Sequence, residues 1–412
     1  MAPDGGSGGG VVVTGLGTVG ACGAGGAGLA AALAAGLPPL SEVDRTAGYH
    51  RPGSARLACL ARGVPLSPWL ALAEARRMSP PSKFAVAAAR MALAEAGAAE
   101  DDVITAVVLA TTFGPSSYTE GMLKQIFLDS PESVSPFLFT ESVANAAAAQ
   151  VGIACRARGP NVTIAQREAG ALLAVGRGAA EVASGRVRRA LVGVVEEMTP
   201  LLHAVLDRFG ALARANGLGE ERARPLDRRR NGYLAAEGAT VLVLEREEDA
   251  ARRGARPLAR VAGWGSAFDP SAPPHGWGEG EAGLGRALGR SLARAGTAIP
   301  EVGRIVSGAS GARGGDRLEA RTLRAAWGEV PLPPLVAPKA VTGEHGGGFL
   351  AAAVLAAAGA PVAAPAGFAP DPALGVAPAN GAPLPAPRLT LVTSLAAGGA
   401  AAWLVLAALG AR

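Results

Sequence analysis

The residues Asn161–Gly176, NVTIAQREAGALLAVG, have the pattern of a short apolar strand, a sharp polar turn and a helix of small residues. Many α/β enzymes hold a nucleophile at such a turn, because the N-terminus of the helix carries a partial positive charge that stabilises an anion. The residue that we place at this turn is Gln166, and its amide is not a nucleophile. The pattern predicts either an enzyme that uses a glutamine or an enzyme-shaped protein that has lost the chemistry.

The elements that would position this turn are apolar strands and small-residue helices that alternate along the chain. In the first part of the chain we expect a strand with a Gly-rich turn at 11–23 and further strands at 104–112, 160–165, 188–197 and 239–247. We expect helices at 82–97, 118–128, 141–157 and 167–184. Ser82 is expected to cap the helix at 82–97, and Gly97 to end it.

After about residue 250 the same order of elements starts again. Strands are expected at 258–268 and 302–310, helices at 283–296 and 345–359, and a Pro-rich surface connection at 361–387. The apolar C-terminus is interrupted by Thr393, Ser394 and Gly398-Gly399, which favours two buried strands around a turn over a membrane-spanning helix. The repeated order predicts an α/β protein with a flexible lead at 1–10 and two similar halves at 11–250 and 251–412.

Composition narrows the function classes. The chain of 412 residues has 39 basic and 34 acidic residues, a formal charge of +5, and arginines that cluster locally. Such clusters are typical of solvated surface or of a site for an acidic partner or a phosphate group, and the aromatic interleaving of nucleic-acid-binding proteins is absent. The three cysteines have no CxxC spacing, and the N-terminus lacks the layout of a signal peptide. These features favour a cytoplasmic protein with no disulfide, no metal and no membrane partner.

Four segments together resemble the β-ketoacyl-ACP synthases of the thiolase superfamily, and the resemblance covers about residues 11–406. The segments VVVTGLGTV, SVSPFLFTESVANAAAAQVGIACRARGPNVTIA, ARPLDRRRNGYLAAEGATVLVLE and PKAVTGEHGGG stand in the order seen in that family. The resemblance implies a thiolase-like αβαβα five-layer fold built from two duplicated halves, and an obligate dimer. It also implies that the strand Asn161–Ala165 pairs across the dimer interface.

Active members of the family use one cysteine, which takes the acyl chain from a carrier protein, and two histidines that assist decarboxylation of the malonyl thioester. The resemblance places these three positions at Gln166, at Gly308, eight residues before Asp316, and at Glu344 in KAVTGEH. No catalytic residue is therefore intact: Gln166 cannot form a thioester, Gly308 offers no side chain, and Glu344 would repel a malonyl carboxylate. His345 would enter the site only after a one-residue slip, and is otherwise a surface or cap histidine.

With three catalytic positions substituted beside intact scaffold motifs, the chain resembles the chain-length factor of type II polyketide synthases. This implies a non-condensing subunit that pairs with an active ketosynthase α subunit as a heterodimer and shapes the tunnel that sets polyketide or polyene chain length. No cofactor is expected, since the substrates are carried on the phosphopantetheine of a separate acyl carrier protein. Two alternatives stay open: a malonyl-ACP decarboxylase that primes chains with glutamine at the cysteine position, and a catalytically inert structural homologue.

The resemblance also implies which residues would end the tunnel. Ser116, Thr119 and Leu123 follow one another at i, i+3 and i+7, on one face of the expected helix. In a chain-length factor this face would close the far end of the tunnel. The alternative is an ordinary packing face.

Overall fold

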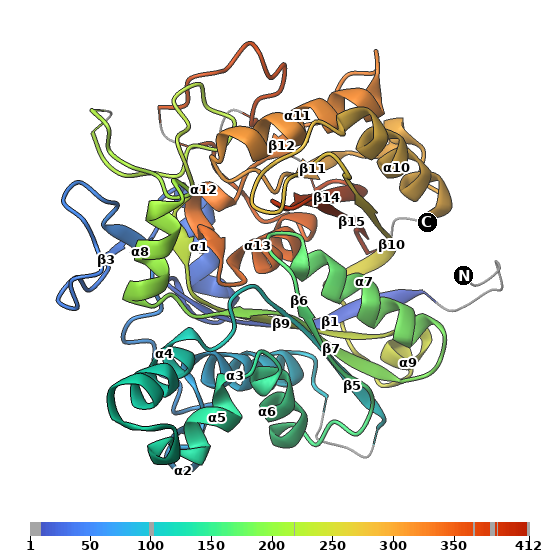
Figure 1. Ribbon diagram of the computed structural model, residues 1–412. Helices are drawn as coiled ribbons and strands as arrows, with labels where there is room; N and C mark the ends of the chain where they lie inside the picture. The colour runs from blue at the N-terminus through green and yellow to red at the C-terminus, as the bar shows by residue number, and fades with distance from the viewer. Residues whose placement is uncertain are drawn as a thin grey trace.

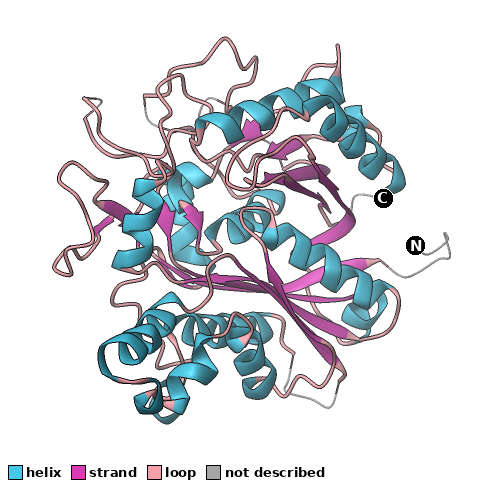
Figure 2. Ribbon diagram, viewed as in Figure 1, coloured by secondary structure: helices cyan, strands magenta, loops and turns pink. Residues whose placement is uncertain are grey.

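The computed structural model describes residues 10–98, 103–217, 219–365, 367–379, 384 and 386–409. Of the expected flexible lead at 1–10, all but Gly10 lies outside these residues. Figure 1 follows the chain through the fold, and Figure 2 shows helices on both sides of the strands.

An 11-stranded mixed sheet forms the centre, in the order β12-β11-β14-β15-β10-β1-β9-β7-β5-β6, with β2 (Gly23–Ala24) added on β1. The strands of the first half are β1 (Val11–Gly20), β5 (Thr105–Thr111), β6 (Asn161–Ala165), β7 (Arg189–Glu196) and β9 (Gly238–Arg246). Those of the second half are β10 (Ala259–Phe268), β11 (Arg304–Val306), β12 (Leu335–Val336), β14 (Leu389–Leu395) and β15 (Ala400–Ala407). In both halves the spatial order is third, second, fourth, fifth and first strand, which is the order expected of a duplication.

The two halves touch edge to edge only briefly, since β1 and β10 pair over Val11–Val13 and Ala259–Val261. Beyond that point each half is a separate layer, and helices fill three further layers (Figure 1). The outer layers are α3 (Pro80–Glu95) with α6 (Ala146–Ala154), and α10 (Glu281–Arg294) with α11 (Arg313–Trp327). The middle layer is α7 (Gly170–Ala183) with α13 (Gly348–Ala357). The αβαβα five-layer prediction is confirmed.

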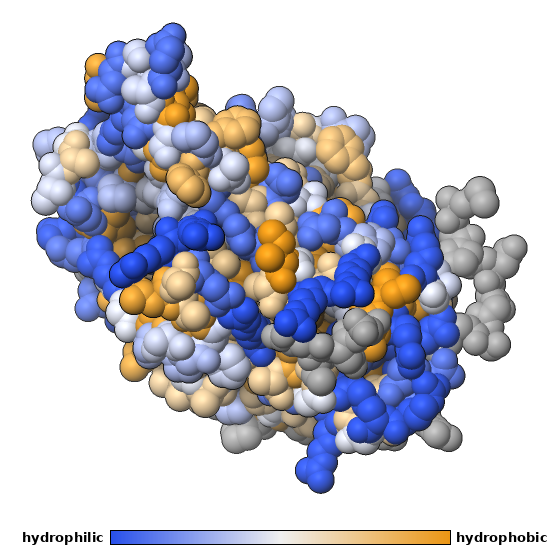
Figure 3. Space-filling view, turned by 90° about the horizontal axis from the view of Figure 1, so that it is seen from below, coloured by the Kyte–Doolittle hydropathy of each residue, from blue (hydrophilic) through white to orange (hydrophobic). Residues whose placement is uncertain are grey.

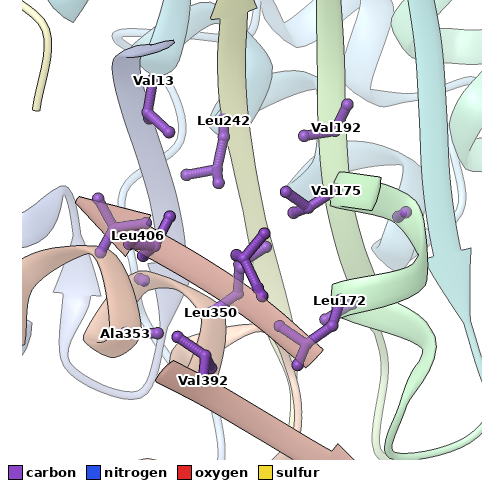
Figure 4. Packing of buried hydrophobic residues seen from close by; sticks show 14 of the residues in the cluster. Val13, Leu172, Val175, Val192, Leu242, Leu350, Ala353, Val392 and Leu406 are labelled. Carbon is purple, nitrogen blue, oxygen red and sulfur yellow. The ribbon is translucent and has the colours of Figure 1, made fainter. Parts of the chain in front are cut away.

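Small residues let these layers approach closely. A Cβ added to Gly15 or Gly17 of β1 would lie 2.0 Å from Ala92 O or 1.9 Å from Ala88 O of α3. The glycines of VVVTGLGTV are therefore required by the helix that lies on them. In the middle layer, side chains such as Leu172 and Leu350 fill the space between the two halves (Figure 4).

Shorter elements surround these layers. The helices are α1 (Gly26–Ala35), α2 (Leu72–Ala75), α4 (Ser116–Lys124), α5 (Pro136–Ser142), α8 (Pro200–Arg208), α9 (Glu247–Arg252) and α12 (Lys339–Thr342), with a π turn at Gln125–Asp129 and 3-10 turns at Pro131–Ser133 and Ile299–Glu301. A small sheet joins β13 (Glu344–His345), β8 (Ala235–Ala236), β4 (Leu57–Cys59) and β3 (Ser41–Glu42). It brings chain segments from both halves to one edge of the site.

Two helix predictions were wrong in detail. The helix expected at 82–97 begins at Pro80, because proline suits a first helical position. Ser82 therefore lies inside the helix, and its hydroxyl donates to Glu141 (2.7 Å) instead of capping the helix. The helix expected at 141–157 is two helices, since α5 ends at Ser142 and α6 begins at Ala146. The end at Gly97 is confirmed by its left-handed backbone, with φ of 59°.

The C-terminal prediction of two strands is confirmed. β14 and β15 pair as antiparallel neighbours, and Gly398 and Gly399 between them both have positive φ. Across the described part of the chain, no helix combines the length and the apolar character that crossing a membrane requires.

Candidate functional site

The strand-to-helix turn lies between the end of β6 at Ala165 and the start of α7 at Gly170. Gln166 continues the strand, because its backbone N–H donates to Thr111 O (3.1 Å). Its side-chain oxygen turns back and accepts from the N–H of Arg167 (2.7 Å). The amide is thereby held against its own backbone.

Glu168, two residues further on, turns into the site. One of its carboxylate oxygens accepts from the backbone N–H of Ala397 (3.2 Å), and its carbonyl accepts from the Ser394 hydroxyl (2.6 Å). Desolvation, with the nearby charge of Glu344, raises the pKa of Glu168 to about 7. A carboxyl group that is partly protonated at neutral pH therefore lies beside the N-terminus of α7.

Glu344 faces Glu168 from the second half of the fold and is already paired. Lys339 Nζ lies 2.7 Å from Glu344 Oε1 and 2.8 Å from Oε2, and both side chains are buried. The ammonium group also lies 4.7 Å from the centre of the Phe349 ring. The Lys339 ammonium group therefore neutralises the negative charge of the Glu344 carboxylate.

His345 also reaches the site. Its backbone is left-handed, with φ of 72°, and its ring lies between Phe113 and Tyr233, with ring centres 5.1 Å and 5.7 Å away. Nδ1 lies 3.4 Å from the Thr112 hydroxyl, and Nε2 is buried with no hydrogen-bond partner among the described residues. Burial lowers the pKa of His345 to about 4, so the ring is neutral at pH 7. It is not a surface histidine.

Gly308 lies just after β11 and is not among the residues that line the site. Its N–H donates to Glu319 (3.0 Å), and an added Cβ would lie 2.5 Å from Thr393 O. This backbone therefore has no room for a side chain at position 308. Asp316 accepts from the N–H groups of Ser310 and Gly311, so the acidic residues of this motif hold the loop in place.

A cavity of about 580 Å³ leads to Glu168 and His345. One wall is α8 and the residue after it, through Leu202, Val205, Leu206 and Phe209. The lining also includes His275 and Trp277, and Arg167 Nη2 lies 3.0 Å from His275 Nδ1. None of the residues that line this cavity is a cysteine, and Gln166 and Gly308 are not among them. The space suits an apolar or amphipathic ligand, but it offers no thiol to an acyl group.

The three expected tunnel residues all lie on α4, outside this cavity. The Ser116 hydroxyl donates to Glu197 (3.2 Å), and the Thr119 hydroxyl to the carbonyls of Pro115 (3.1 Å) and Ser142 (3.2 Å). Leu123 is 42% exposed. The structure therefore turns two of these side chains into the fold and leaves one at the surface.

Beyond the three expected tunnel residues, several large apolar side chains that follow Leu123 in the chain are exposed. They are Phe127 and Leu128 in the π turn and Phe137 and Phe139 in α5. α5 packs against α4. Seen from below the view of Figure 1, the surface has hydrophobic side chains in several separate places among polar ones (Figure 3).

Comparisons with known proteins identify the family of this chain. The family model described as the β-ketoacyl synthase N-terminal domain matches residues 10–250. A putative polyketide β-ketoacyl synthase 2 of Streptomyces coelicolor is 31% identical over 378 residues, 89% of this chain and 86% of that protein. A 3-oxoacyl-[acyl-carrier-protein] synthase 2 of Vibrio cholerae is 28% identical over 328 residues, 78% of each chain.

Two solved structures have the same fold. The ishigamide ketosynthase/chain length factor superposes with a TM-score of 0.85 at 30% identity, covering 98% of this chain and 100% of that one. A type II polyketide synthase ketosynthase in complex with its acyl-carrier protein gives 0.86 at 22% identity, covering 97% of this chain and 100% of that one. With a family match over more than half its length, this chain belongs to the β-ketoacyl synthase family and has its thiolase-like fold.

Proposed function

We propose that this protein is a non-condensing ketosynthase-like subunit, a chain-length factor. The observation that carries the proposal is the cavity. It keeps the volume and the apolar walls of a substrate site, yet its floor is built from Glu168 and His345, with no thiol among its lining residues. Glu344, paired with Lys339, lines a small neighbouring pocket that shares Glu168 and His345. Condensation needs a nucleophile that accepts the acyl chain, and this floor does not supply one.

Of the three residues expected at the cysteine and histidine positions, Gln166, Gly308 and Glu344, only the first is replaced in this proposal. Glu168, rather than Gln166, is the turn residue that reaches the cavity floor, and its carboxylate engages the Ala397 N–H. Gly308 and Glu344 keep the positions given by the motifs. A bound carboxylate at the turn removes the nucleophile as effectively as an amide does.

The proposed partner is an active ketosynthase α subunit. β6 lies at the end of the central sheet and pairs only with β5 among the described residues, and Asn161 and Ala165 are exposed. An edge strand of this kind offers unpaired backbone groups to another chain. The likeness to a ketosynthase/chain length factor supports a heterodimer. An acyl carrier protein is the proposed third component.

Ser116, Thr119 and Leu123 on α4 are proposed to set the chain length at the interface. Leu123 and the exposed phenylalanines Phe127, Phe137 and Phe139 are apolar side chains that a partner subunit would cover. Large apolar surfaces are typical of subunit interfaces.

A second candidate is malonyl-ACP decarboxylation. The observation that favours it is His345, a neutral ring with an unpartnered Nε2 in the same cavity as Glu168. A donor at such a position would stabilise the enolate that forms when CO₂ leaves. In this candidate the Glu168 carboxyl takes the role expected of the glutamine at the cysteine position.

The test is to express the chain with and without a ketosynthase that has an intact Cys-His-His set. Native mass spectrometry should show a one-to-one heterodimer that condenses malonyl units. The chain alone, incubated with acyl-ACP and malonyl-ACP, should carry no acyl adduct and release no CO₂. A stable and active homodimer would contradict the proposal, and Glu168-dependent CO₂ release would favour the decarboxylase.

A further inference from the structure

A second hollow, of about 310 Å³, shares α8 with the large cavity, and its lining is polar. α8 contributes Leu202, Val205 and Leu206 to the large cavity but Asp207 and Arg208 to this hollow. The hollow is lined by Arg51, Pro52, Ser54, Asp207, Arg208 and Arg214. The lining residues come from the loop before β4, from the end of α8 and, at Arg214, from the segment that follows α8.

The loop that carries Arg51 is held in a defined shape. The Arg45 guanidinium donates to the carbonyls of Ala55 (3.0 Å) and Arg51 (3.0 Å) and to the Ser54 hydroxyl (2.9 Å). The Ser54 hydroxyl donates to Arg51 O (2.7 Å), and the N–H of Ala55 donates to Asp207 on α8 (3.0 Å). The root of the Arg51 side chain is therefore fixed relative to α8.

The charges of the hollow are not balanced. Asp207 is used by Arg214, through Nε to Oδ1 (3.0 Å) and Nη2 to Oδ2 (2.9 Å). The guanidinium groups of Arg51 and Arg208 form no hydrogen bond or ion pair with other described residues, and both residues are exposed. Three arginines against one aspartate leave an excess of two positive charges (3 − 1) on the lining of the hollow.

Guanidinium groups present their N–H donors in a planar fork that matches the oxygens of a phosphate group. Arg208 in the last turn of α8 also interacts with the negative end of the helix dipole, but that interaction leaves its donors free. The space is larger than one phosphate group needs, so it accepts a diphosphate or a phosphate ester with a polar substituent.

We propose that the hollow between Arg51, Arg208 and Arg214 is a binding site for a phosphate group. The site is distinct from the large cavity, and only the carrier-borne source of its ligand rests on the proposed function. Its phosphate has two sources, a free small phosphate compound or the phosphate of a pantetheine arm, and the two share the same recognition by two arginine forks.

The test is isothermal titration calorimetry of the full chain with pyrophosphate and, separately, with phosphopantetheine, at low and at physiological salt. Arg51→Gln and Arg208→Gln should each weaken binding at least tenfold, and the double variant should abolish it. Both side chains are exposed, so the variants should keep the thermal unfolding midpoint of the wild type. The matched control is Arg290→Gln on α10, which removes the same unit charge from an exposed position elsewhere.

Binding of pyrophosphate assigns the site to a free ligand, and binding of phosphopantetheine alone assigns it to a carrier-borne arm. Both results support the site when Arg51 and Arg208 are required and Arg290 is not. Absence of binding to either probe would overturn the proposal. An equal loss in the Arg290→Gln control would also overturn it, because the binding would then reflect only the overall positive charge.

Discussion

Lys339 and Glu344 form an ion pair in the interior of the site, with 1% and 4% of their side chains exposed and Nζ 2.7 Å from Oε1. The pair joins α12 to β13, and Glu344 also faces Glu168. A paired carboxylate repels an incoming anion less than a free one does. Because it is paired, Glu344 should repel a malonyl carboxylate less than the sequence predicts. The main role of the pair is structural.

Removing one member of this pair should destabilise the fold strongly. Glu344→Gln leaves a buried ammonium group without its counter-ion, which typically costs about 3–5 kcal/mol. The free energy of unfolding in urea should fall by that amount at pH 7. The matched variant is the double change Lys339→Met with Glu344→Leu, which removes both charges and should recover most of the loss. A single variant as stable as the wild type would show that the pair is solvated.

The pKa of Glu168 predicts how stability changes with pH. The folded-state pKa of about 7 lies above the ordinary value of 4.5. The folded state therefore binds the proton more tightly than the unfolded state, and this contribution to stability is complete below pH 4.5 and is lost as pH rises through 7. Glu168→Gln removes the titration.

Relative to the wild type, Glu168→Gln should become more stable between pH 5 and pH 8 by about 1–3 kcal/mol. Urea unfolding of both proteins at the two pH values measures this difference. Gln166→Ala is the control, since residue 166 carries no titrating group, and its difference from the wild type should not change with pH. If the difference in unfolding free energy between Glu168→Gln and the wild type does not change with pH, the Glu168 carboxyl keeps its ordinary pKa.

Cysteine substitutions test which residue occupies the nucleophile position. Glu168→Cys places a thiol beside the N-terminus of α7 and in the cavity, where the helix lowers a thiol pKa. It should be alkylated by iodoacetamide faster than Gln166→Cys, and acylated by an acyl-pantetheine thioester where the other is not. Mass spectrometry of peptides separates both from the native cysteines. If Gln166→Cys reacts faster than Glu168→Cys, residue 166 occupies the nucleophile position.

The strands and the two halves of the fold could be predicted because each long strand is a run of apolar residues, and the runs recur in the same order in both halves. The five layers were implied only by the family resemblance. β11 and β12 have three and two residues and give almost no periodic signal. The break between α5 and α6 was missed for another reason. Glu141, at the end of α5, accepts hydrogen bonds from Ser79 and Ser82 of a distant segment, and no local pattern reveals that contact.

The turn residue was difficult to predict because QRE offers three consecutive polar residues, and polarity does not tell which one points inward. In the structure Arg167 and Glu168 line the cavity and Gln166 does not. α7 begins at Gly170, where an added Cβ would lie 3.1 Å from the Ala110 side chain. The helix expected at 345–359 would begin at His345 and leave it as a surface or cap histidine. His345 lies in β13, ahead of α13, and its left-handed backbone turns the ring inward.

The last prediction concerns product length. Replacing Ser116 or Thr119 on α4 by phenylalanine adds a ring where the tunnel should end, and overpacking such a wall costs about 1–3 kcal/mol. An additional two-carbon unit pressed against the ring should be disfavoured about tenfold for each 1.4 kcal/mol, so products should become shorter while turnover continues.

Leu123→Ala should have the opposite effect, lengthening the products or broadening their distribution. Because Leu123 is already 42% exposed, while the Ser116 and Thr119 hydroxyls are bonded inside, it is also the change that disturbs the fold of the subunit least. The measurement is the mass of products from the reconstituted heterodimer with its carrier protein, with native mass spectrometry to show that the complex is intact. If all three variants give wild-type products, this face of α4 serves only packing, and chain length is controlled by other residues.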